Sequence, residues 1–108
     1  MAAYARRADL RVRCVEFHSY AAGGHLMMPG HRDLGSTVSL SVLLADPSTF
    51  DGGAFLFDGA PVRGVGRGDG VLFPSERVHN VEPVTRGTRH ALVLELWAGA
   101  ANTHDRSR

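Results

Sequence analysis

Three residues in this sequence have the types and the spacing to bind one metal ion together. His31 and Asp33 form a His-x-Asp triplet, and His79 follows 48 residues later. Residues two apart in an extended segment point to the same side, so the triplet presents an imidazole and a carboxylate together. Two imidazoles and one carboxylate hold a transition metal and leave coordination positions open. Such a triplet also arises by chance on protein surfaces, so its meaning depends on the surrounding elements.

The elements expected around these residues are short β-strands. The 13 glycines and 5 prolines recur every few residues, and no apolar stripe of helical period lasts three turns. Strand patterns separated by turn signals lie at 12–17, 36–45, 54–57, 61–65, 70–73, 77–83 and 88–97, with a possible further strand near 26–28. The pattern predicts an all-β fold, either a barrel or a double-sheet jelly roll.

Two of these strands alternate between a face with polar residues and a purely aliphatic face. Ser39 and Ser41 share a face of the strand near residue 40, and Arg89 and Glu95 share a face of the last strand. An aliphatic face normally forms the core of a sheet. A barrel with a polar cavity reverses this arrangement, and its outward aliphatic faces then need a cover.

A basic residue, Arg89, follows His79 by ten positions. The order of His-x-Asp, a distal histidine and this arginine resembles the iron- and 2-oxoglutarate-dependent dioxygenases of the prolyl 4-hydroxylase and lysyl hydroxylase type. Segments that share the resemblance are 16–20 with Gly23 and Gly24, 35–40, 50–55, 68–75 and 94–97. The resemblance covers roughly residues 12–97 and implies a double-stranded β-helix (jelly roll) dioxygenase domain there, with 1–11 and 98–108 as flanking segments.

The resemblance also implies roles for single residues. Fe(II) is bound by His31, Asp33 and His79. Arg89 pairs with the 5-carboxylate of 2-oxoglutarate through a bidentate contact that suits a guanidinium. Tyr20 and Ser39 lie beside this cosubstrate, although Tyr20 could equally be a packing residue at the mouth of the barrel. No catalytic residue is implied beyond the metal ligands.

The implied activity is that of an oxidoreductase, a dioxygenase that hydroxylates an unactivated C–H bond of a peptidyl proline or lysine. Succinate and CO2 are released, and L-ascorbic acid binds as the accessory that keeps the iron reduced. Two alternatives stay open. A catalytically incomplete fragment or binding module would keep the metal motif without turnover. A cupin-type metal protein is disfavoured, because cupin sites use a His-x-His pair with a Glu and another His.

Composition and length limit the classes of molecule that this protein is expected to bind. The 108 residues suffice for one domain, and the 12 basic and 11 acidic residues are scattered, which argues against a nucleic-acid partner. No apolar run approaches the roughly 18 residues of a membrane span, and the start lacks the apolar stretch of a signal peptide. The resemblance to prolyl and lysyl hydroxylases implies a peptide or protein substrate, and it leaves the cytoplasm and the endoplasmic reticulum both open as the compartment. The single cysteine, Cys14, excludes an intrachain disulfide.

One feature of the resembled fold is expected to be absent. Dioxygenases of this type carry N-terminal helices on the outside of the larger sheet, yet only about eleven residues precede the first predicted strand. We therefore expect the buttressing helices to be missing, and a partner or a missing N-terminal segment to cover the outer sheet face. The histidines that flank the triplet in sequence, His18 and His25, are interpreted as loop residues or partly hydrogen-bonded side chains rather than ligands.

Overall fold

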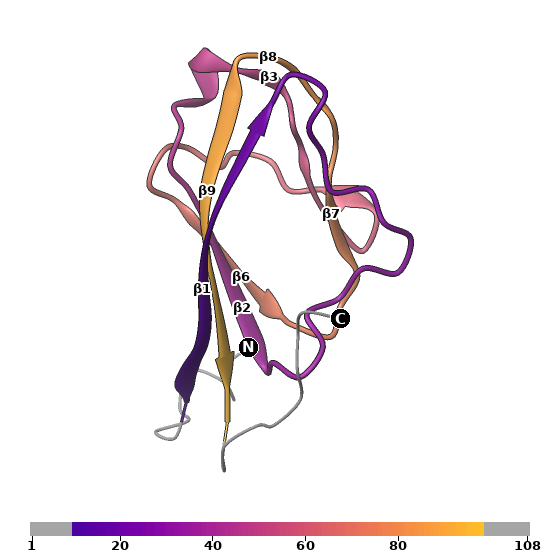
Figure 1. The fold of residues 1–108 in the computed structure, drawn as a ribbon, viewed down its shortest axis with the longest axis vertical. Helices are drawn as coiled ribbons and strands as arrows, with labels where there is room; N and C mark the ends of the chain where they lie inside the picture. Colours follow the sequence, from indigo (N-terminus) through magenta and orange to yellow (C-terminus); the bar gives the residue numbers. More distant parts are fainter. Residues whose placement is uncertain (1–9, 99–108) are drawn as a thin grey trace.

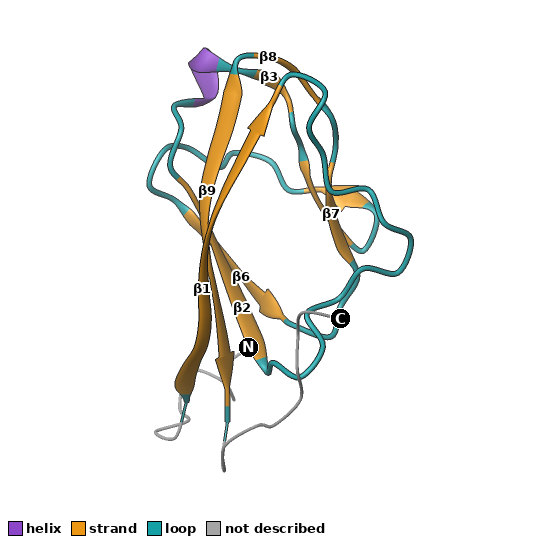
Figure 2. Cartoon of the chain, in the orientation of Figure 1, coloured by secondary structure: helices purple, strands orange, loops and turns teal. Residues whose placement is uncertain are grey.

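Nine β-strands and one turn of 3₁₀-helix make up residues 10–98, the part of the chain that the computed structural model describes (Figure 1). The elements are β1 (Arg11–Ala21), β2 (Val38–Leu43), η1 (Pro47–Thr49), β3 (Asp51–Gly52), β4 (Phe55–Phe57), β5 (Ala60–Pro61), β6 (Gly70–Pro74), β7 (His79–Val81), β8 (Val84–Arg86) and β9 (Thr88–Trp97). Figure 2 shows that η1 is the helical element among these residues. Within residues 10–98 no helix is long and apolar enough to cross a membrane.

The strands form one large antiparallel sheet and two smaller ones. The large sheet has the order β1-β9-β2-β6, and the smaller sheets have the orders β5-β4-β7 and β3-β8. In Figure 1 the long strands of the large sheet run down one side of the molecule and β7 runs down the other. The all-β, jelly-roll fold predicted from the sequence is confirmed.

The strand bounds agree with the prediction for β9 and differ at the N-terminal end of the described chain. The predicted strand 88–97 is β9. The first strand extends beyond the predicted 12–17 to Ala21, because its pairing with β9 continues as far as Ala21, opposite Thr88. The possible strand near 26–28 is reduced to one bridge, between Leu26 and Val81. The flanking segments 1–11 and 98–108 lie outside the described residues, apart from residues 10, 11 and 98.

Two very short strands, β3 and β8, were not predicted from the sequence pattern. Their segments read as turns, since two or three residues carry no measurable alternation. They form because β3 pairs with β8, with Asp51 opposite Arg86, and Gly52 adopts a positive φ of 74° that suits glycine. A Cβ on Gly52 would lie 2.4 Å from the Pro83 carbonyl oxygen, so this close pairing requires glycine.

A β-bulge sets which residues of β1 face the interior. The register with β9 shifts between Val12 and Cys14, and from there the burial pattern alternates strictly. The consequence is that Glu16, His18 and Tyr20 face inward along one strand.

The large sheet has a polar inner face and an apolar outer face, as the alternation predicts for a barrel with a polar cavity. Ser39, Arg89 and Glu95 are buried on the inside. On the outside, one row of cross-strand neighbours runs through all four strands: Val15, Leu94, Leu40 and Leu72. The side chains at the two edges of this row are 56% and 48% exposed, so nothing in the described chain covers them.

The apolar core lies inside the barrel, between the two walls. Phe55, Phe73 and Val81 are buried in contact, and Tyr20 and Leu26 pack against them. Because these three side chains come from β4, β6 and β7, they join the smaller sheet to the large one next to the polar inner face.

Candidate metal centre

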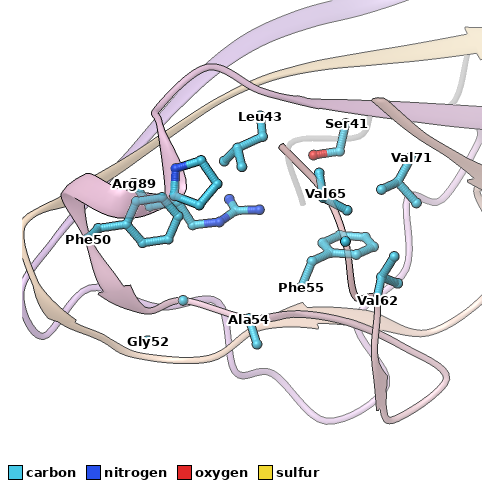
Figure 3. Close-up of a pocket in the computed structure, with 13 residues that line it drawn as sticks. Ser41, Leu43, Phe50, Gly52, Ala54, Phe55, Val62, Val65, Val71 and Arg89 are labelled. Carbon is cyan, nitrogen blue, oxygen red and sulfur yellow. The ribbon is translucent and has the colours of Figure 1, made fainter. Parts of the chain in front are cut away.

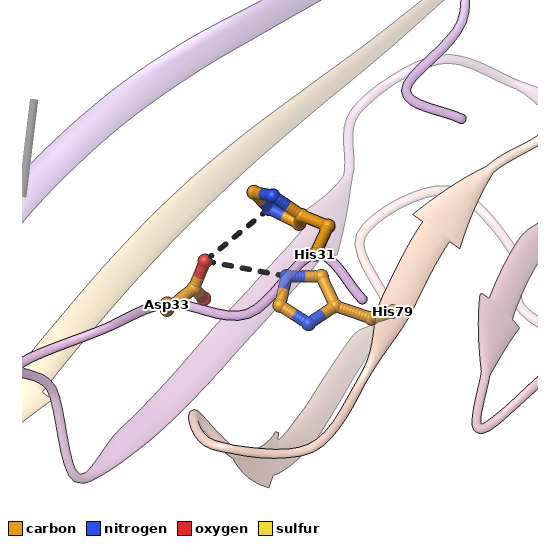
Figure 4. A group of neighbouring side chains, drawn as sticks. All are labelled: His31, Asp33 and His79. Atoms are coloured by element: carbon orange, nitrogen blue, oxygen red, sulfur yellow. Dashed lines mark ion pairs between the residues drawn. The ribbon is translucent and has the colours of Figure 1, made fainter. Parts of the chain in front are cut away.

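His31, Asp33 and His79 converge in the folded chain (Figure 4). Asp33 Oδ1 lies 3.6 Å from His31 Nε2 and 3.3 Å from His79 Nε2, and the ligand atoms all lie within 4.8 Å of one another. A first-row metal about 2.1 Å from each nitrogen or oxygen separates neighbouring donors by about 3 Å. The group therefore fits a single metal ion, with the mixed N/O donor set expected for iron.

Backbone hydrogen bonds tie the loop that carries the His-x-Asp triplet to the opposite wall. The Asp33 amide donates to the Ser75 carbonyl at 2.9 Å, and the His79 amide donates to the His31 carbonyl at 3.1 Å. The His31 amide closes a turn onto the Met28 carbonyl at 3.0 Å. Thus the three side chains are positioned by main-chain contacts that need no metal.

The imidazole of His79 is oriented by a contact at Nδ1, the ring nitrogen that points away from Asp33. Its Nδ1 lies 3.0 Å from the Arg77 carbonyl, which can only accept, so Nδ1 carries a hydrogen and Nε2 is the nitrogen directed at Asp33. Phe73 packs on the same ring with centroids 4.7 Å apart. A backbone carbonyl on the far nitrogen is the usual way in which proteins fix the tautomer of a metal-binding histidine.

The carboxyl group of Asp33 is held in its ionised form. Burial would raise its pKa, but hydrogen bonds with His79 and Ser39 outweigh burial, and the pKa lies below its ordinary value. Burial likewise opposes the charged form of His79, whereas the bonds to Asp33 and to the Arg77 carbonyl raise its pKa above the ordinary value. The site is thus a buried anion that already attracts positive charge.

Ser39 supports Asp33 rather than facing the interior space. Its hydroxyl donates to Asp33 Oδ2 at 2.5 Å and lies 2.8 Å from the Ser75 hydroxyl, and both serines are fully buried. Ser41, two residues further along β2, lines the cavity instead. The sequence offered no signal for Ser75, because its partner depends on how β2 and β6 pair.

A cavity of about 160 Å³ opens beside the three side chains. Its wall contains all three, together with residues from β1, β2, β4, β6, β7 and β9: Glu16, His18, Tyr20, Ser41, Phe55, Phe73, Val81, Arg89, Ala91, Val93 and Glu95. Leu26 completes the lining from the loop after β1. The predicted site residues therefore share one cavity, with the exception of Ser39.

Arg89 is a buried cation, and no carboxylate among residues 10–98 pairs with it. Its side chain belongs to a residue that is 7% exposed, and burial lowers its pKa, against which Tyr20 acts weakly. Among residues 10–98 no acidic group forms an ion pair with it. Because an unpaired buried charge is costly, its presence indicates an anionic ligand, and a guanidinium binds a carboxylate bidentately.

A second, mostly apolar cavity meets the first at Arg89 (Figure 3). The two share Ser41, Phe55 and Arg89. Gly53 lies on its floor with a φ of 69°, and a Cβ there would lie 3.0 Å from Arg89 Cδ. Glycine at this position therefore leaves room for the arginine side chain to pass between the cavities.

Tyr20 has a packing contact and also a place in the cavity wall. It packs against the aromatic core cluster, and it lines the cavity opposite Arg89 on the neighbouring strand. Burial raises the pKa of its phenol, so the hydroxyl keeps its hydrogen. His18, for which the sequence suggested a loop position or a partly hydrogen-bonded side chain, lies within β1, contacts Glu16 and faces this cavity. The sequence pattern did not reveal its place in a strand, because the predicted strand ended at residue 17.

A second group of metal-binding residue types, Cys14, Glu16 and Glu95, lies on the same inner face. Glu95 is fully buried, accepts a hydrogen bond from Ser36 at 2.8 Å and pairs with Arg13 at 3.6 Å. These contacts neutralise its charge, so we assign Glu95 a structural role.

The chain is similar in sequence to curated bacterial hydroxylases, whereas no protein-family model matches it. It is 35% identical over 104 residues to a PKHD-type hydroxylase of Teredinibacter turnerae, covering 85% of this chain and 46% of that protein. It is 37% identical over 89 residues to a PKHD-type hydroxylase of Acidovorax ebreus, covering 70% and 39%. The chain thus spans about half the length of the curated relatives it matches.

Two solved structures share the fold. An oxidoreductase of the 2OG-Fe(II) oxygenase family from Burkholderia pseudomallei superposes with a TM-score of 0.78 at 22% identity, covering 94% of this chain and 50% of that one. An RmlC-like cupin protein from Desulfovibrio desulfuricans superposes with a TM-score of 0.52 at 23% identity, covering 84% and 83%. At these identities the likeness shows the fold, and the side chains of the site must discriminate between the two kinds of protein.

Proposed function

Because the chain belongs to the 2OG-Fe(II) oxygenase superfamily, we propose that residues 12–97 form an Fe(II)- and 2-oxoglutarate-dependent dioxygenase domain. The observation that carries this proposal is that one cavity holds both the His-Asp-His group and a buried arginine that has no acidic partner in the described part of the chain. A metal alone would explain the first feature, but only an anionic cosubstrate explains the second.

In this proposal His31 Nε2, His79 Nε2 and the Asp33 carboxylate hold the iron. Together with 2-oxoglutarate, bound Fe(II) supplies the oxidation of an unactivated C–H bond by dioxygen, with release of succinate and CO2. The Arg77 carbonyl orients the imidazole of His79, and the Ser39 hydroxyl orients the ionised carboxylate of Asp33. Preformed donors of this kind need no reorganisation when the metal binds.

Arg89 binds the distal carboxylate of 2-oxoglutarate in this proposal, and Tyr20 lies beside it on β1. The low polarity around the guanidinium strengthens a charge-assisted contact, because water is largely excluded. Phe55 and Phe73 form the apolar wall between this position and the metal group. The cosubstrate is thus bound at both ends by charge and along its length by apolar contact.

A peptidyl proline or lysine is the substrate we propose, with ascorbate as the accessory reductant. The support for a hydroxylase is the name of the curated relatives, PKHD-type hydroxylase. Incubation of the iron-loaded protein with 2-oxoglutarate, ascorbate and proline- or lysine-containing peptides should yield succinate and a peptide that has gained one oxygen atom. Hydroxylation of a free small molecule but of neither peptide would reject this substrate class.

The experiment that tests the iron and cosubstrate sites is an anaerobic titration with Fe(II) and then 2-oxoglutarate. Wild type should develop the visible metal-to-ligand charge-transfer band, Asp33→Ala should abolish it, and Arg89→Ala should require a higher cosubstrate concentration. Glu82→Ala, at an exposed position, is the matched control and should behave as wild type. A folded wild-type protein that develops no band would contradict the proposal.

A non-catalytic module that keeps the metal motif is the second candidate. The observation that favours it is the exposed apolar row on the outer face of the large sheet, which includes Val15 and Leu72. Iron-dependent succinate formation separates the two candidates, since binding of both ligands without any succinate would identify a module.

A further inference from the structure

A chain of three polar side chains runs along the inner face of β1, across the cavity from the metal group. His18 Nε2 lies 2.9 Å from Glu16 Oε1, and His18 Nδ1 lies 3.4 Å from the Tyr20 hydroxyl. All three residues line the 160 Å³ cavity, and the alternation of the strand places them in a row at every second position. Neither the metal ligands nor the proposed cosubstrate contacts account for Glu16 and His18.

The direction of the hydrogen bonds in this chain follows from the chemistry of the groups. An ionised Glu16 can only accept, so the hydrogen of a neutral His18 imidazole is on Nε2. Nδ1 is then the acceptor, and the Tyr20 hydroxyl must donate to it. Burial raises the pKa of Tyr20, which ensures that the phenol has this hydrogen to donate.

Once its hydrogen is committed to His18, the Tyr20 oxygen presents only lone pairs to the rest of the cavity. Directly opposite on β9 is Arg89, whose guanidinium has only donors and no acidic partner within residues 10–98. A phenol oxygen turned in this way can accept from a guanidinium, whereas a freely rotating hydroxyl can also present its hydrogen to it.

We propose that His18 is a positioning residue that acts through Tyr20: the Glu16–His18–Tyr20 chain turns the Tyr20 oxygen toward Arg89 as an acceptor and so holds the guanidinium ready for the cosubstrate carboxylate. This inference rests on the proposed function. It assigns Tyr20 to Arg89 rather than to the carboxylate itself.

A double-mutant cycle tests the coupling. In the Fe(II)-loaded protein, His18→Phe should weaken 2-oxoglutarate binding by about threefold to tenfold, the worth of one neutral hydrogen bond, and leave Fe(II) affinity unchanged. In a Tyr20→Phe background, the same substitution should have no effect on 2-oxoglutarate affinity. His25→Phe, at an exposed histidine outside the cavity, is the matched control. Equal losses in both backgrounds would overturn the proposal.

The protonated nitrogen of His18 can be read without iron or cosubstrate. Long-range ¹H–¹⁵N spectra of the metal-free protein should show His18 protonated at Nε2 with Nδ1 as a hydrogen-bond acceptor. Glu16→Gln should shift the population toward Nδ1–H, because a side-chain amide can donate to Nε2. A wild-type His18 protonated at Nδ1 would overturn the chain.

These two readouts separate failure of the inference from failure of the proposed function. Wild type that binds no 2-oxoglutarate would reject the proposed function whatever the His18 spectrum shows. Binding that is insensitive to His18→Phe would reject only the role of His18. Circular dichroism of each variant establishes that the comparison is made on folded protein.

Discussion

Tyr20 and Arg89 lie directly opposite each other on the antiparallel strands β1 and β9, and both line the same interior cavity. The pair joins the first and last strands of the described chain across 69 positions of sequence. A slip of β1 by one residue against β9 would turn Tyr20 to the outer face and away from Arg89. The long β1–β9 ladder is therefore what places the proposed cosubstrate contact inside the barrel.

Replacing the buried Arg89 with an uncharged residue should stabilise the fold and abolish 2-oxoglutarate binding. Arg89→Met keeps much of the side-chain length but removes an unpaired buried charge, so the free energy of unfolding of the metal-free protein should rise by about 1–3 kcal/mol. Urea denaturation measures this change, and the same variant should lose 2-oxoglutarate binding. Arg63→Met, at an exposed position, serves as control. A destabilised Arg89→Met would mean that the guanidinium has a structural partner.

Removing the Ser39 hydroxyl should affect the metal site more than the cosubstrate site. Ser39→Ala leaves Asp33 Oδ2 without its buried donor, which should lower Fe(II) affinity about tenfold and stability by about 1–2 kcal/mol. Metal titration and thermal melting measure the two effects. Ser41→Ala removes a neighbouring hydroxyl that does not contact Asp33 and should leave Fe(II) affinity unchanged. Equal losses in both variants would show that the Ser39–Asp33 contact is not specific.

The outer face of the large sheet should bind apolar probes. Leu72→Thr and Val15→Thr replace side chains that are 48% and 56% exposed with a polar residue of good strand propensity. Each should reduce the fluorescence of a bound hydrophobic dye, while Fe(II) binding is retained. Met27→Thr, in a loop away from this sheet, is the control and should change the dye signal less. Unchanged dye binding in all variants would place the apolar probe site elsewhere.

The ion pair between Asp51 and Arg86 should contribute to stability only above acidic pH. Arg86 holds the pKa of the Asp51 carboxyl below its ordinary value, so the contribution is present above the unfolded-state pKa of about 4 and is lost as pH falls through the folded-state value. Asp51→Asn should therefore lower the melting temperature slightly at pH 7, and the difference from wild type should vanish at strongly acidic pH. Both groups are exposed, so added salt should weaken the effect. A difference that persists in acid would point to a packing effect of the substitution.

The residues of the site could be found from the sequence because their types and spacing are local or nearly so. His31 and Asp33 are two positions apart. Arg89, ten positions after His79, lies at the start of β9, whose bounds agree with the predicted strand 88–97. The inverted polarity of the large sheet could also be predicted, since alternation along a single strand records which side chains share a face.

Only the tertiary structure decided which side chains on different strands contact one another. Ser39 turns to Asp33 and Ser75 rather than to the cavity, and Tyr20 lies opposite Arg89 because β1 continues to Ala21 and pairs with β9. These contacts depend on register, on a bulge near Val12 and on pairing between strands far apart in sequence. Alternation within one strand carries no information on such distances, because hydrogen bonds between strands form only once the chain has closed on itself.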